Sequence, residues 1–193
     1  RIQHPGPPEN ERIRALPCKA LPLRLTLRAG HSLATTVSEA FAQAGFVSGY
    51  LRLDGATFAP LNFVTPAPAP GDGHAAWYSA THQIPRARAR HAGLHLGVSD
   101  SKPFVHCHGI WEGTGALADM GHMLCHDSIL AQDCTVAGWG LWGAGLVSRY
   151  DSETDFTLFN PEQQDECPKP DAFLITLRPN QDIGTALQSF ARN

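Results

Sequence analysis

Alternation of apolar and polar residues is the sequence feature that most constrains the fold. Residues 23–28 read Leu-Arg-Leu-Thr-Leu-Arg, a period of two that places every second side chain on one face of a strand. Further segments of strand character are residues 46–53, 57–64, 75–98 in two pieces, 104–111, 129–146 and 149–159. Helical spacing occurs at residues 33–44, with Ser32 as an N-cap and Gly45 as a natural stop. The pattern predicts an α+β domain, mainly antiparallel β-sheet packed with one helix.

The segments outside this alternating region divide the chain. Residues 1–20 are rich in proline and charge and are expected to form an N-terminal arm, which leaves the main domain over residues 21–160. Residues 161–172 contain prolines among acidic residues and are interpreted as a linker. Residues 173–193 open with an echo of residues 23–28 and continue like the predicted helix. We interpret them as the start of a second, truncated repeat; the alternative is a chance match between two strand–helix units.

Composition and charge exclude several classes of protein. With 42% hydrophobic and 17% charged residues, the chain of 193 residues is an ordinary globular protein. Its net charge of −3 disfavours nucleic acid as a partner, because nucleic acid usually selects a basic domain. The five cysteines are odd in number and form no C-x-x-C pair, so no disulfide framework is predicted. A reduced, cytoplasmic location is predicted instead. No apolar stretch approaches the ~20 residues of a membrane span, so no membrane association is expected.

Three histidines in the middle of the chain suggest a metal site. In a strand, His106 and His108 project from one face while Cys107 points to the other. His122 follows a small-residue loop predicted over residues 113–121, and the adjacent Gly121 allows two backbones to approach closely. Three neutral imidazoles leave a fourth position open, as in catalytic zinc sites, although iron, nickel or manganese would also suit them. The alternative is that the histidines only decorate a solvated strand face.

A metal-bound water or carbonyl also needs a group that transfers protons. If the histidine strand continues regularly, Glu112 falls on the same face and is the predicted catalytic acid–base residue; otherwise it is an exposed strand-end glutamate. His126 and Asp119 are weaker candidates, and His95 either supports a ligand or is an ordinary sheet residue.

Arg86, Arg88 and Arg90 alternate with alanines and are expected to form one basic edge of a strand. Such an edge could bind a carboxylate or phosphate, or it is a solvated face or an ion pair between subunits. Three arginines on a net-acidic chain are too few to indicate a nucleic-acid surface.

Several of these segments resemble the PPC ("plant and prokaryote conserved") family over about residues 23–160. The strongest match is Pro-Phe-Val-His-Cys-His at residues 103–108 with the later Gly-His at 121–122. The resemblance implies an antiparallel sheet with one helix, a homotrimer, and a divalent metal, usually zinc, bound by the histidines at 106, 108 and 122. The fold is also similar to that of acetolactate decarboxylase, which holds zinc with an H-x-H and a later histidine.

The chain departs from the family pattern at several points. Met120 replaces the first glycine of the usual Gly-Gly-His, and no Arg-Gly-Arg-Pro AT-hook occurs. The minor-groove DNA binding of the plant members is therefore not expected.

These observations lead to three hypotheses about function. The first is a zinc-dependent lyase or hydrolase that acts on a small carboxylate-bearing substrate. The second is a DNA-binding protein of the PPC family, and the third is a non-catalytic trimeric metal-binding module.

Overall fold

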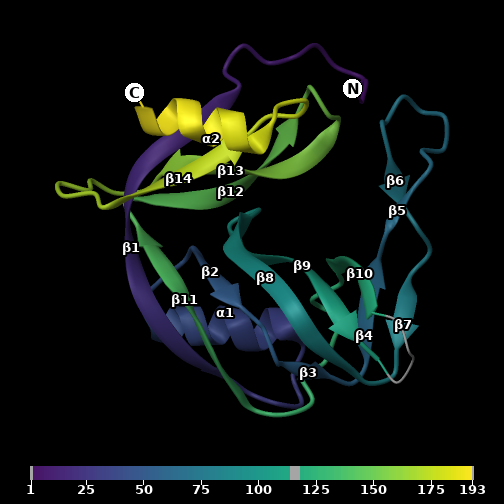
Figure 1. The fold of residues 1–193 in the computed structure, drawn as a ribbon. Coiled ribbons are helices and arrows are strands. Elements are labelled where there is room, and N and C mark those ends of the chain that lie inside the picture. The colour runs from purple at the N-terminus through teal and green to yellow at the C-terminus, as the bar shows by residue number, and fades with distance from the viewer. Residues whose placement is uncertain (1, 114–117, 193) are drawn as a thin grey trace.

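A strongly bent, mainly antiparallel sheet, a small two-stranded sheet and two helices make up the described part of the protein (Figure 1). The computed structural model describes residues 2–113 and 118–192. The helices are α1 (Leu33–Gln43) and α2 (Ile183–Arg192). The strands are β1 (Ile13–Leu27), β2 (Gly49–Arg52), β3 (Thr57–Phe58), β4 (Leu61–Val64), β5 (Pro66–Ala67), β6 (Trp77–Tyr78), β7 (His82–Ile84), β8 (Ala87–Ser99), β9 (Lys102–Glu112), β10 (Ala118–Met123), β11 (Cys134–Trp142), β12 (Ala144–Asp151), β13 (Phe156–Gln163) and β14 (Ala172–Leu177). The predicted α+β class is confirmed.

The long strand β1 joins the two ends of the chain to the sheet. Its first half, Ile13–Cys18, pairs with β14, and its second half, Lys19–Leu27, pairs with β11. From there the sheet continues in the order β2, β8, β9, β10, β4 and β7. The hairpin of β12 and β13 meets β8 at one parallel bridge, between Val147 and Val98.

Helix α1 covers one face of this sheet and forms the core with it. It begins where predicted, because the Ser32 side chain accepts a hydrogen bond from the Thr35 N–H, and it ends before Gly45, whose φ of 81° few other residues tolerate. The buried helix residues include Val37 and Phe41. They belong to the same cluster as the inward side chains of β8 and β9, which include Leu94, Leu96, Val105, Cys107 and Trp111.

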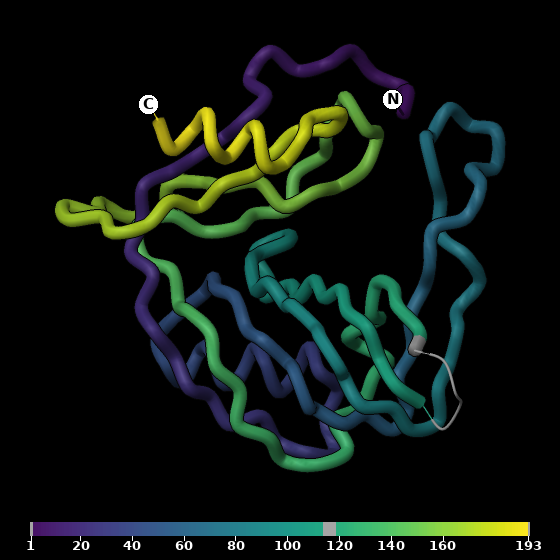
Figure 2. Tube along the Cα trace, in the orientation of Figure 1, coloured from purple at the N-terminus to yellow at the C-terminus, as the bar shows by residue number. Residues whose placement is uncertain are grey.

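The two ends of the chain lie on the side of the molecule occupied by β12, β13 and β14 (Figure 2). Residues 13–20, within the expected N-terminal arm, are part of β1, and residues 172–192 form the strand and helix β14 and α2. Two ion pairs with nearly buried carboxylates tie these segments to the β12–β13 turn: Arg12 to Glu153 at 2.7 Å, and Arg178 to Asp151. The division into a domain and a truncated repeat stays a prediction.

The structure differs from the sequence prediction around His122. A small-residue loop was expected over residues 113–121, but residues 118–123 form β10, which pairs with β9. Residues 114–117 of that predicted loop lie outside the described residues. The strand forms despite its weak pattern because β9 on one side and β4 on the other supply its pairing partners.

Candidate metal centre

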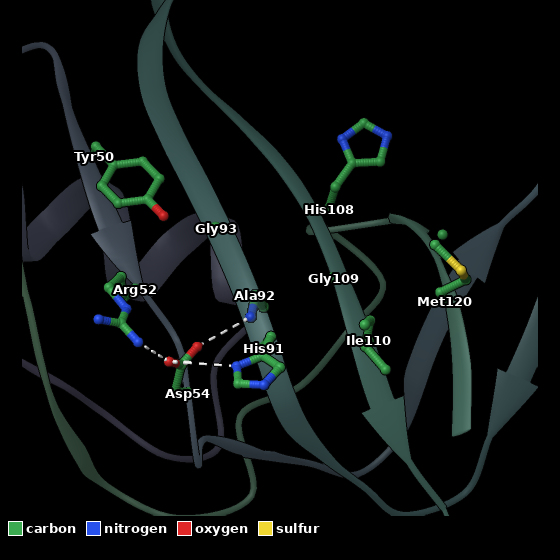
Figure 3. Close-up of a pocket in the computed structure, with 11 residues that line it drawn as sticks. Tyr50, Arg52, Asp54, His91, Ala92, Gly93, His108, Gly109, Ile110 and Met120 are labelled. Atoms are coloured by element: carbon green, nitrogen blue, oxygen red, sulfur yellow. Dashed lines mark hydrogen bonds and ion pairs between the residues drawn. The ribbon is translucent and has the colours of Figure 1, made fainter. Parts of the chain in front are cut away.

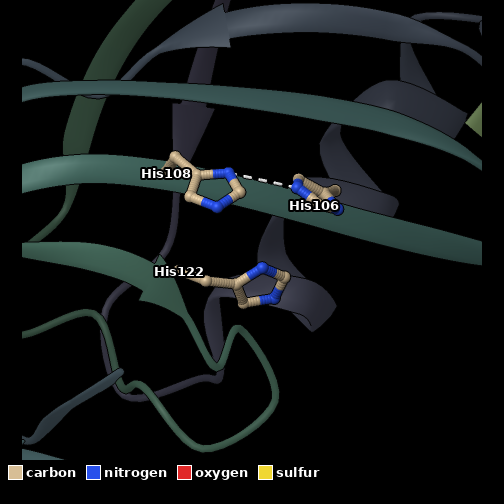
Figure 4. A group of neighbouring side chains, drawn as sticks. All are labelled: His106, His108 and His122. Atoms are coloured by element: carbon tan, nitrogen blue, oxygen red, sulfur yellow. Dashed lines mark hydrogen bonds between the residues drawn. The ribbon is translucent and has the colours of Figure 1, made fainter. Parts of the chain in front are cut away.

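The three histidines predicted as metal ligands meet on the face of the sheet opposite α1. His106 and His108 come from β9, and His122 lies directly opposite His108 on β10. One ligand nitrogen from each of the three lies within 4.8 Å of the others. Figure 4 shows the three rings turned toward one another, with His106 Nε2 and His108 Nδ1 3.1 Å apart. The sequence prediction that these side chains converge is confirmed.

The spacing of the imidazoles suits a metal ion. Zinc binds histidine nitrogen at about 2.0–2.1 Å, so nitrogens sharing one tetrahedral ion lie roughly 3.4 Å apart. Small rotations of rings already within 4.8 Å reach that spacing. The donor set is all imidazole, which zinc and other transition metals accept.

The surroundings hold these histidines in the neutral form that a metal requires. Burial, helped by the nearby His122, His108 and His95, lowers the pKa of His106 to about 3. Burial also lowers the pKa of His108 and of His122. Because only a neutral imidazole has a free lone pair, the group is ready for a metal at neutral pH without releasing protons.

Gly121 lets β10 lie close enough for His122 to join the group. A Cβ at this position would lie 2.4 Å from the Val64 carbonyl oxygen and 3.0 Å from Phe63 Cδ2. Real Cβ atoms essentially never approach other atoms under 3.0 Å, so a side chain here would push β10 away from β4. The predicted need for a glycine beside the third histidine is confirmed.

Glu112, the predicted acid–base residue, lies at the end of β9. Its side chain is 45% exposed and pairs with Arg90 at 3.8 Å. Among the described residues, the two hollows that His108 lines do not include it. The structure therefore does not bring Glu112 next to the histidines.

The weaker candidates for proton transfer, Asp119, His126 and His95, lie apart from one another. Asp119 and His126 are exposed, the first on β10 and the second in the turn after it. His95 lies opposite His106 on β8, and its ring is 5.1 Å from that of Tyr50. It is thus a neighbour of the group, but the three-histidine cluster does not include it.

Arg88 and Arg90 are exposed on β8 and Arg86 is exposed just before it, while the intervening Ala87 and Ala89 are buried. A bulge between Ala89 and His91 then shifts the alternation by one residue. Beyond it Ala92, Leu94 and Leu96 are buried, so His91 joins the histidine-bearing face.

A polar hollow of about 440 Å³ lies beside His108 and was missed by the sequence analysis (Figure 3). Its side chains include Tyr50, Arg52, Asp54 and His91. Asp54 binds Arg52, accepts a 3.2 Å hydrogen bond from the Ala92 N–H, and lies 3.8 Å from His91. Burial opposes its ionisation, but the bonds from Arg52 and Ala92 hold the pKa of Asp54 below its usual value. The shift in apolar alternation between residues 89 and 92 was the one sequence signal for His91.

An apolar chamber of about 620 Å³ opens on another side of His108 and His122. Its walls come from β4, β6 and β13, and we define it by Val64, Trp77, Tyr78, Phe156 and Leu158. His108 therefore borders both the polar hollow and the apolar chamber, and His122 borders the chamber.

Fold and site together define a mainly antiparallel α+β domain that carries a histidine triad on the open face of its sheet. No protein-family model and no curated protein matches the sequence. Solved structures do share the fold. A PPC protein of Pyrococcus horikoshii aligns with a TM-score of 0.55 at 11% identity, covering 76% of this chain and 96% of that one.

Two further structures of this fold carry different descriptions. A metal-containing protein of Archaeoglobus fulgidus aligns with a TM-score of 0.53 at 19% identity, over 77% of this chain and 97% of that one. A protein of Ralstonia eutropha, ascribed DNA binding only provisionally, aligns with a TM-score of 0.55 at 14% identity, covering 71% of this chain and 89% of that one. The chain has the PPC fold, and the resemblance seen in the sequence is confirmed at that level.

All five cysteines are free thiols. No helix in the described part of the chain is long and apolar enough to cross a membrane.

Proposed function

We propose that the protein is a metal-dependent enzyme, a lyase or hydrolase that acts on a small carboxylate-bearing substrate. The observation that carries the proposal is the convergence of three neutral imidazoles on an accessible face of the sheet. Zinc is the proposed metal, held by His106, His108 and His122. When bound with an open position, it would polarise a carbonyl or lower the pKa of a bound water.

The polar hollow supplies groups for binding and proton transfer. His91 lines it together with His108 and lies 3.8 Å from Asp54, whereas Glu112 lies outside it, 3.8 Å from Arg90. The geometry therefore favours His91 over Glu112 as the acid–base residue. Once a substrate is found, a larger loss of kcat in His91→Gln than in Glu112→Gln would support this choice, and the reverse would restore Glu112.

Metal binding is tested by elemental analysis of the purified chain. We expect about one zinc or similar ion per chain, and its loss in the His106→Ala/His108→Ala variant. The matched control is His31→Ala/His126→Ala, which removes two exposed histidines outside the group and should retain the metal. If the wild-type chain binds no metal even after reconstitution, the enzyme proposal fails.

Two alternatives remain distinct from this proposal. A non-catalytic metal-binding trimer would bind metal tightly but turn over no small carboxylate. DNA binding draws support from the descriptions of two structures of this fold, from Ralstonia eutropha and Bacteroides thetaiotaomicron, and the net charge of −3 weighs against it.

A further inference from the structure

The apolar chamber indicates what kind of ligand reaches the histidine group. Its volume of about 620 Å³ lies in the range of small-molecule sites, and His108 and His122 form part of its wall. The Tyr78 ring lies 6.1 Å from the His122 ring, edge to face. A molecule in the chamber is therefore adjacent to the nitrogens that would hold the metal.

Contacts of His74 join two segments that form the walls of the chamber. His74, whose side chain is 11% exposed, pairs with Asp72 at 2.9 Å, and its Nε2 lies 3.1 Å from the Asp155 carbonyl oxygen. Its ring also packs at 4.7 Å on Trp77 and at 5.0 Å on Phe156. This contact joins the β5–β6 segment to the β12–β13 turn, so the chamber is a built site and not a gap between loose loops.

The chemistry of the walls selects an apolar occupant. Three aromatic rings, Trp77, Tyr78 and Phe156, contact one another with centroids 5.7–6.2 Å apart. No Asp, Glu, Lys or Arg is among the described residues that line the chamber. Trp77 and Tyr78 are 38% and 50% exposed, so apolar surface is available to a ligand. A charged group placed here would lose its hydration without gaining a partner.

We propose that the apolar chamber binds a ring-sized apolar substituent of the same ligand whose polar group reaches the metal position. This inference rests on the proposed function, because it places the reacting group at the histidines. The carboxylate or hydroxyl groups of such a ligand would face the polar hollow on the other side of His108. The substrate class is therefore a small acid that carries an aryl or branched alkyl group.

Two hydroxamates of matched chelating chemistry test this directly. The full chain is loaded with Co²⁺, and its visible absorption is titrated with acetohydroxamate and with benzohydroxamate, which differ in a methyl against a phenyl group. Burying the ring should make benzohydroxamate bind about tenfold tighter or more. Leu158→Trp adds bulk to the wall of the chamber and should abolish this preference.

The control variant is Leu21→Trp, because Leu21 is 39% exposed and Leu158 is 38% exposed, both on strands. Equal binding of the two hydroxamates by the wild-type chain overturns the chamber inference and leaves the metal proposal intact. If Co²⁺ does not bind, or if neither compound changes the spectrum, the proposed function falls and the inference falls with it. The wild-type comparison decides the matter even if the Leu158 variant fails to fold.

Discussion

Replacing Gly121 with alanine tests whether the close contact of β10 with β4 assembles the metal centre. The new Cβ would lie 2.4 Å from the Val64 carbonyl oxygen, whereas ordinary contacts begin at 3.4 Å. The two strands must therefore separate by about 1 Å. Their register pairs His122 with Val64 and Met123 with Phe63, so the displacement falls on the third histidine itself.

Two effects of different size are expected from this displacement. Forcing an extra carbon into a packed site costs about 1–3 kcal/mol of unfolding free energy. Moving one ligand away from its partners should weaken metal binding by roughly ten- to hundredfold, as occurs when groups that orient ligands are removed. Urea denaturation measures the first effect, and competition with a chromophoric chelator measures the second.

The control is Gly184→Ala in helix α2, where the nearest atom to a new Cβ is Asp182 Oδ1 at 3.5 Å. There alanine meets no clash and favours the helix, so stability should be unchanged or rise by up to about 1 kcal/mol. If Gly121→Ala retains both the wild-type stability and the wild-type metal affinity, the argument from the close contact is refuted.

Four further predictions concern stability. Arg178→Ala leaves the Asp151 carboxylate, 1% exposed, without its charged partner and should cost about 3 kcal/mol, whereas the exposed pair of Arg149 with Glu162 should lose at most about 1 kcal/mol in Arg149→Ala. Hydrogen bonds from Thr154 and Arg178 outweigh the effect of burial and lower the pKa of Asp151. The stability that Asp151 contributes is therefore present above pH about 4 and is lost as the pH falls through the lowered pKa, so the Tm measured at decreasing pH should fall in that range. The hydrogen bond to Asp72 raises the pKa of His74, so the stability that His74 contributes is complete below the usual histidine pKa and is lost as the pH rises through the raised value. Amide hydrogen exchange of residues 74–78, corrected for the intrinsic pH dependence of exchange, should show this as a loss of protection. Ser32→Ala removes the N-cap of α1 and should lower the unfolding free energy by about 1 kcal/mol, whereas no change would show that the cap is dispensable.

Much of the local structure could be predicted because it depends on residues close together in the sequence. A strand alternates its side chains with a period of two, so the projection of His106 and His108 from one face followed from their spacing alone. The same applies to α1, whose cap and stop lie beside it at Ser32 and Gly45. The requirement for a small residue at 121 was also expected, although the atom it avoids was not.

Pairings between distant segments could not be predicted in this way. The small residues of 113–121 have no strand periodicity, and β10 exists because β9 and β4 offer their backbone hydrogen-bonding groups to it. Likewise Glu112 lies on the expected face, but its partner Arg90 comes from a neighbouring strand with a bulge. Side-chain direction is local, whereas the choice of partner is not.

The sequence by itself therefore determined the fold class and the common face of His106 and His108, since both follow from alternation and spacing along single segments. His122 was expected from the adjacent Gly121 and the family resemblance, and the pairing of β10 with β9 places it opposite His108. Only the tertiary structure decided what surrounds the triad. Residues 50, 52, 54 and 91 line the polar hollow with His108, while residues 64, 77, 78, 156 and 158 line the apolar chamber. These walls come from segments up to about a hundred residues apart, and the bent sheet brings them together through pairings that no single segment encodes.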